Sequence, residues 1–206
     1  MKKCLLYFLL LLCLGLNAQK KIYNKILADH IGLIQIDATN CYIVEVHTSL
    51  GNEISVEAEI EGEYSQDLGL EVVTNGNTLI VETGFTPSFE NPNDKLSAHK
   101  VISILLRLNM PVHKKLEIFG TNSRVVIDGV YKELNVSLSD GTCLLNNVDA
   151  DATVKSQSGN IKVVSESAQI NATSKYGKVS FNSIPYGTST YKLETVTGNI
   201  DLSKTE

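Results

Sequence analysis

The feature that most constrains the fold is a pattern of apolar residues at fixed offsets from a small residue in the second half of the chain. The stretch SQSGNIKVV at 156–164 is echoed by TVTGNIDL at 195–202. Apolar side chains stand seven and five positions before each small residue, and two and four positions after it. The small residues that share this pattern are Ser123, Gly141, Gly159, Gly177 and Gly198.

The spacing of these small residues predicts an all-β fold built from stacked units. The first four lie 18 residues apart, and the last follows after 21, with the extra residues in a loop at 184–190. A unit this short cannot bury its apolar face alone, so we expect a stacked, β-helix-like β-solenoid with repeats of about 18 residues over 113–204. An antiparallel sandwich, which also has short strands at near-regular spacing, is the alternative.

Each small residue is expected to turn a corner between two short strands. Glycine enters the left-handed region of backbone conformation without steric cost, whereas alanine does not. Gly159→Ala is therefore predicted to cost about 1 kcal/mol or more.

The first half of the mature chain alternates apolar and polar residues with a period of two, which is typical of half-buried strands. The clearest case is EISVEAEIEG at 53–62, and Asn75-Gly76 between two aliphatic runs indicates a hairpin. We expect an N-terminal β-strand region at 19–112 that continues the same domain, with a long loop at 84–99. Residues 19–206 are thus predicted to form a single domain.

The N-terminus has the composition of a secretory signal peptide. Lys2 and Lys3 precede an apolar run at 4–16, which is too short to span a bilayer as a helix, and cleavage after Ala18 gives a signal peptide at 1–18. A lipidated Cys13 is the alternative. No later apolar run reaches membrane-spanning length, so we expect an exported protein of the periplasm or cell surface with no membrane-spanning segment after cleavage.

The net charge narrows the classes of binding partner, and the cysteines bear on whether a disulfide forms. Removal of residues 1–18 lowers the count of basic residues from 18 to 16 against 23 acidic ones, so the net charge moves from −5 to about −7. That balance disfavours nucleic acid and anionic membrane surfaces, both of which reward Lys and Arg. Cys41 and Cys143 lie in alternating segments, and buried thiols are favoured over a disulfide.

No residue is predicted to be catalytic, to bind a cofactor or to bind a metal. The histidines lack the spacing of metal ligands, and they are His30, His47, His99 and His113. The glutamates of 45–61 have the oxygen ligands that calcium takes, but a solvated strand face explains them better. Asp149 and Asp151 point the same way if their segment is extended, which leaves a carbohydrate-active enzyme as an alternative.

Polar residues flank the small residues and would form a stripe along one edge of the fold. A stripe of this kind can bind a glycan or an envelope protein, although corners that simply face water also look like this. The flanking residues are Asn122, Asp140, Ser158, Tyr176, Thr197, Arg124, Thr142, Asn160, Lys178 and Asn199.

Residues 30–204 resemble the bacterial putative-adhesin family of β-strand-repeat proteins, which are exported proteins of largely unknown function. The resemblance rests on ISILLRLNMP, which ends in proline, and on the segments LEIFGTNSRVVIDGV, LNVSLSDGTCLLNNV, ATVKSQSGNIKVV and KLETVTGNIDL. It implies a single stacked β domain in the cell envelope and supplies no catalytic residues. The chain departs from the family pattern at Ser123 and at Tyr176.

These observations together predict a non-enzymatic exported cell-envelope protein that acts as an adhesin-like binding or scaffolding module. The alternatives are a polysaccharide lyase or hydrolase that uses Asp149 and Asp151, and an accessory protein of envelope stress or signalling.

Overall fold

The computed structural model describes residues 19–62, 65–86, 89, 102–180 and 184–205. This part of the chain forms strands without a helix. The strands are β1 (Lys20–Leu27), β2 (Leu33–Asp37), β3 (Ile43–Ser49), β4 (Glu53–Gly62), β5 (Leu68–Asn75), β6 (Thr78–Phe85), β7 (Ile102–Pro111), β8 (Lys115–Ser156), β9 (Asn160–Ser165), β10 (Gln169–Ser174), β11 (Thr190–Thr195) and β12 (Ile200–Lys204).

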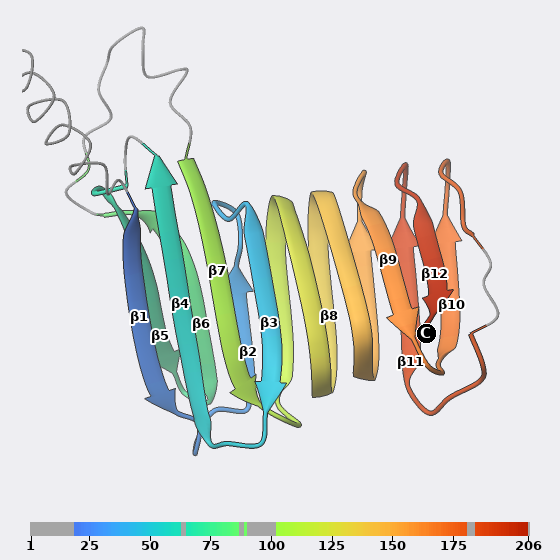
Figure 1. The fold of residues 1–206 in the computed structure, drawn as a ribbon, viewed down its shortest axis with the longest axis horizontal. Coiled ribbons are helices and arrows are strands. Elements are labelled where there is room, and N and C mark those ends of the chain that lie inside the picture. Colours follow the sequence, from blue (N-terminus) through green and yellow to red (C-terminus); the bar gives the residue numbers. More distant parts are fainter. Residues whose placement is uncertain (1–18, 63–64, 87–88, 90–101, 181–183, 206) are drawn as a thin grey trace, which may run out of the picture.

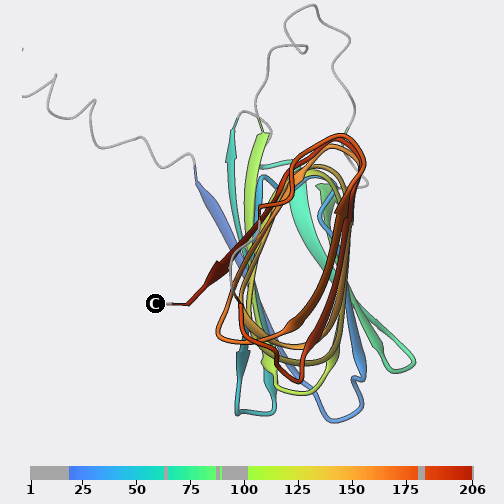
Figure 2. The same ribbon diagram turned by 90° about the vertical axis from the view of Figure 1, so that its right-hand side faces the viewer.

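All the strands belong to one mixed, nearly closed, barrel-like sheet. Its main path runs β1-β4-β7-β3-β8-β2-β6-β5, and β9 to β12 extend it from β8. The strands lie side by side along the molecule, and they enclose a flattened oval when viewed along its long axis (Figures 1 and 2). At one end β1 and β5 approach each other, where Lys20 Nζ donates to Leu68 O at 2.7 Å.

Strand β8 has 42 residues and winds around the oval (Figure 1). A straight strand of this length would extend roughly 140 Å. It bends where the backbone takes a positive φ, at Gly129 (107°), Gly141 (93°) and Asn147 (48°). A main-chain hydrogen bond joins one circuit to the chain that leads into β8, since Lys132 N donates to Lys114 O at 2.9 Å.

The apolar residues predicted by alternation fill the interior of the oval. On β4 the side chains of Ile54, Val56, Ala58 and Ile60 are fully buried, and the glutamates between them face outward. The predicted hairpin is confirmed, because β5 and β6 pair antiparallel on either side of Asn75 and Gly76, with φ 60° at Gly76.

The prediction of a stacked β-solenoid with repeats of about 18 residues is wrong. The sheet is mixed, since β4 pairs antiparallel with both β1 and β7, whereas other pairs are parallel. Strands from the first half also pair with the second half, because β2 and β3 both lie against β8. Within the second half the strands do not follow chain order: β11 lies between β8 and β10.

The position of β11 has a clear physical reason in Tyr191. This side chain is fully buried, with Ala152 beside it on β8 and Ile170 beside it on β10. Stacking in chain order would place Tyr191 on the last strand, where one side of its ring would face water. The segment 184–190, predicted to be a loop, runs as irregular chain up to Thr190 and lets the chain return between β8 and β10.

Both cysteines of the described chain are free, buried thiols, as favoured by the sequence. Burial raises the pKa of Cys41 to about 11 and that of Cys143 to about 12. The predicted signal peptide, residues 1–18, lies outside the described residues, as does most of the predicted loop at 84–99.

We expect neither thiol to react with a thiol reagent at pH 8 while the protein is folded. Raising a thiol pKa by two lowers its thiolate population about a hundredfold, and burial also blocks the approach of the reagent. For protein prepared without residues 1–18, which hold Cys4 and Cys13, absorbance measured with an aromatic disulfide reagent should show no reaction in buffer and two reactive thiols in denaturant. Rapid reaction of the folded protein would contradict this placement of Cys41 and Cys143.

Candidate functional site

The predicted corner residues lie along one edge of the oval, which we call the glycine-corner edge. An added Cβ at Gly159 would lie 2.8 Å from Gly141 O, and one at Gly198 would lie within 3.0 Å of Gly159 O. One at Gly177 would lie within 3.0 Å of Gly198 O, and one at Gly141 within 3.0 Å of Ser123 O. The corners therefore contact one another in the order 123, 141, 159, 198, 177.

The left-handed backbone predicted for these glycines is wrong at three of four positions. Gly141 has a positive φ, but Gly159, Gly177 and Gly198 are not among the positive-φ residues of the described chain. What requires glycine at these three positions is the close approach of the neighbouring backbone, which leaves no room for a side chain.

Hydroxyl groups three residues before the glycines hold the corners, and the sequence analysis missed them. Gly159 N donates to Ser156 Oγ at 2.8 Å, and Gly177 N donates to Ser174 Oγ at 2.9 Å. Ser174 Oγ also donates to Gly198 O at 2.7 Å, so one hydroxyl joins two corners. The signal was present in the sequence as the recurring pattern Ser/Thr-x-x-Gly.

Ser123 occupies its corner differently. Its side chain is fully buried, and its Oγ lies 2.9 Å from Ala38 O and 2.7 Å from Cys41 O, close enough to donate to either. The serine thus ties β8 to the turn between β2 and β3. The polar residues predicted to flank the corners face water; Thr142 is the one half-buried member.

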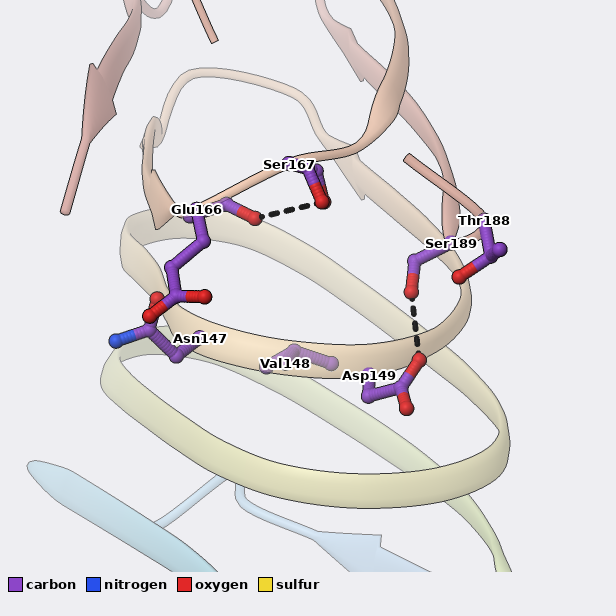
Figure 3. A pocket seen from close by; sticks show the side chains of 8 residues that line it. Asn147, Val148, Asp149, Glu166, Ser167, Thr188 and Ser189 are labelled. Atoms are coloured by element: carbon purple, nitrogen blue, oxygen red, sulfur yellow. Dashed lines mark hydrogen bonds between the residues drawn. The ribbon is translucent and has the colours of Figure 1, made fainter. Parts of the chain in front are cut away.

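A shallow polar groove runs along the opposite edge of the oval, and we call it the far-edge groove. Its first part has a volume of about 430 Å³. That part is lined by Asn147, Val148, Asp149, Ser165, Glu166, Ser167, Thr188 and Ser189 (Figure 3). It continues into a second hollow that shares Asp149, Thr188 and Ser189 and adds His113, Lys132 and Asp151.

Two neighbouring strands and a loop position the side chains of the far-edge groove. Val148 and Ala150 point into the core, so Asp149 and Asp151 point outward from β8. Ser189 Oγ, just before β11, donates to Asp149 Oδ1 at 2.7 Å (Figure 3). The predicted common direction of Asp149 and Asp151 is confirmed, and both carboxylates are exposed to water.

The groove also brings basic groups to these carboxylates, which the sequence analysis missed. Lys132 and His113 line the same hollow as Asp149 and Asp151. Their distance along the chain hid them, because only the winding of β8 places residue 132 beside residue 151.

The remaining candidate residues do not come together. His47 Nδ1 lies 2.6 Å from Asp128 Oδ2, His113 lines the far-edge groove, His30 is exposed, and His99 lies outside the described residues. In the described ranges, no three His, Cys, Asp or Glu side chains are arranged to hold a metal ion.

The outward glutamates form an ion network rather than an open calcium site. Arg107 Nε lies 3.0 Å from Glu45 Oε2, and its Nη1 lies 3.0 Å from Glu59 Oε1. Hydrogen bonds from Lys21 and Arg107 lower the pKa of Glu59. These charges lie on an inner strand of the sheet, because β4 pairs with β1 on one side and β7 on the other.

A solved structure shares this fold. A putative cell adhesion protein from Clostridium sporogenes aligns over 91% of this chain and 100% of its own, with 14% sequence identity and a TM-score of 0.65. A putative adhesin from Bacteroides fragilis aligns over 89% of this chain and 97% of its own, with 15% identity and a TM-score of 0.42. The resemblance to putative adhesins is confirmed at the level of the fold.

No family model and no curated protein matches the chain. None of the described segments forms a helix long and apolar enough to cross a membrane.

Proposed function

We propose that the protein is a non-enzymatic, exported cell-envelope module that binds an extended glycan or envelope protein along the far-edge groove. The observation that carries this proposal is the continuity of the groove across β8 and the segment leading into β11. Its exposed donors and acceptors, among them Asn147, Thr188 and Lys132, suit a polar ligand that lies across the strands. The fold shared with a putative cell adhesion protein supports a binding role.

A matched pair of arginine substitutions tests the groove. Thr188 is exposed and lines both parts of the far-edge groove, whereas Thr197 is exposed at the glycine-corner edge. We expect Thr188→Arg to weaken binding of the labelled protein to isolated cell envelopes by about tenfold or more, because the longer side chain obstructs the groove. Thr197→Arg adds the same charge elsewhere and should bind like the parent protein.

Equal binding by the parent and Thr188→Arg would contradict the groove as the binding site. Periodate treatment of the envelopes should abolish binding if the ligand is a glycan, and protease treatment should abolish it if the ligand is a protein.

Export is part of the same proposal and is tested separately. The signal peptide expected at 1–18 supports it. Fractionation should recover the protein in the periplasm or at the surface, without residues 1–18. Protease added to intact cells should remove it if it faces outward. A cytoplasmic protein that keeps residues 1–18 would contradict export.

A second candidate function is cleavage of an acidic polysaccharide. The observation that favours it is the hollow that holds Lys132 and His113 beside Asp149 and Asp151, since such cleavage needs both a proton-transfer group and a cation. Asp149→Asn and Asp151→Asn should then abolish cleavage. A parent protein that cleaves none of the envelope polysaccharides removes this candidate.

A further inference from the structure

The last circuit of the fold ends in a strand with an open edge. In the described part of the chain, β10 pairs with β11 on one side alone. Gln169 N donates to Ser189 O at 2.8 Å, and Lys175 N donates to Thr195 O at 3.1 Å. Because main-chain groups alternate in direction along a strand, those of Ile170, Ala172 and Ser174 point to the open edge.

This edge lacks the charges that keep sheet edges apart. Strand β10 reads QINATS and has no charged residue. Strand β1, at the other end of the molecule, carries Lys20, Lys21 and Lys25 within eight residues. Lysine on an edge strand opposes pairing with another chain, so β1 has this protection and β10 does not.

Apolar and aromatic side chains gather at the same end. Ile170, Ala172 and Val179 are half-buried where they pack against the core. Tyr176 is 71% exposed, with Lys175 Nζ 5.1 Å from the centre of its ring, and Tyr186 is 86% exposed; tyrosine is enriched in protein–protein interfaces. Ala168 N donates to Pro185 O at 3.0 Å, so Tyr186 lies near the start of β10 while Tyr176 lies just beyond its end.

We propose that two copies of this chain join end to end through antiparallel pairing of β10 with β10, about a two-fold axis at Ala172. This register uses the main-chain groups of Ile170, Ala172 and Ser174 in both copies and leaves the Ala168–Pro185 hydrogen bond intact. Pro185 already occupies the open side of Ala168, so the pairing ends at Ile170 and Ser174, and Tyr176 of each copy lies next to Pro185 and Tyr186 of the other.

The charges next to β10 also favour a second copy of this chain as the partner, paired antiparallel. The exposed side chains of Lys175 and Lys178 lie beyond one end of β10, and exposed Glu166 lies before the other. Antiparallel pairing brings the positive end of each copy to the negative end of the other, whereas parallel pairing would bring like charges together. The interface then closes with point symmetry, which limits the assembly to a dimer.

Sedimentation velocity of the purified protein tests the proposal. At about 50 µM the parent should sediment predominantly as a dimer. Tyr176→Asp should raise the dissociation constant about tenfold or more, since an interfacial tyrosine is replaced by a charge. Tyr23→Asp alters a tyrosine that is 60% exposed on β1, at the opposite end, and should leave the dimer unchanged. A monomeric parent, or equal weakening by both substitutions, would overturn the proposal.

A cysteine at the axis tests the register without relying on affinity. Directly opposed residues of a hydrogen-bonded antiparallel pair have Cα atoms about 5.5 Å apart, within the range of a disulfide. Ala172→Cys should therefore form a disulfide-linked dimer on mild oxidation, and Thr190→Cys should not. A dimer that cannot be linked through residue 172 would contradict the pairing of β10 with itself.

Discussion

Tyr191→Ala is expected to lower the free energy of unfolding by about 3–5 kcal/mol, the range for removing a large buried aromatic side chain. Tyr191 is fully buried between Ala152 and Ile170, and its hydroxyl donates to Val148 O. For a chain of this size, such a loss lowers the melting temperature by roughly 10 °C. Thermal and urea unfolding followed by circular dichroism measure both quantities.

Ile170→Ala is the control for this prediction. Ile170 occupies the matching position on β10 and is half-buried at the end of the oval, so its truncation should cost roughly half as much or less. Under stacking in chain order, the roles would reverse, because Ile170 would be enclosed and Tyr191 would lie at the end. A larger loss for Ile170→Ala would therefore contradict the observed position of β11.

Gly198→Ala is expected to cost about 1–3 kcal/mol or more, since its Cβ would lie within 3.0 Å of Gly159 O and Gly159 C, which are backbone atoms that cannot rotate away. The cost arises because the added Cβ would push the Gly198 and Gly159 corners apart. Backbone strain does not contribute, because φ at Gly198 is not left-handed. Gly159→Ala is still expected to destabilise the protein, but through close contact with the neighbouring backbone rather than through a left-handed φ. Urea midpoints of the purified variants measure the loss.

Two other glycines serve as controls for this substitution. A Cβ at Gly51 would have no heavy atom nearer than 4.0 Å, so Gly51→Ala should change stability little. Gly76 has φ 60° with nothing within 4 Å, so Gly76→Ala isolates the cost of backbone conformation, about 1 kcal/mol. If Gly198→Ala were no more costly than Gly51→Ala, the close contact of the corners would be wrong.

The sequence predicted which side chains face inward, because alternation with a period of two depends on each strand alone. Ile54 to Ile60 on β4 and Val148 to Asp151 on β8 follow it. It could not predict which strands lie side by side. A strand such as TYKLET fits beside any neighbour with aliphatic residues in register, and only the burial of Tyr191 in three dimensions selects its place between β8 and β10.

The candidate site was predictable only in part, for the same reason. Asp149 and Asp151 are two residues apart in one alternating segment, so their common direction could be inferred, whereas Lys132 and Ser189 reach them through the winding of β8 and the pairing of β11 with β8. The physical reason for glycine at the corners could not be inferred from the sequence either. Positive φ and close backbone approach both select glycine, so the sequence shows the residue without showing its cause.

The order of strands β8, β11 and β10 is the central claim, and cysteine cross-linking tests it most directly. Thr153, Lys192 and Asn171 lie in one row across these strands, and the native thiols are buried. Neighbouring strands are about 4.8 Å apart, and strands separated by one other are about 10 Å apart. A short bifunctional thiol reagent should link cysteines placed at 153 and 192 rapidly, and should not link cysteines at 153 and 171. Rapid linking of 153 to 171, with none between 153 and 192, would contradict the fold described above.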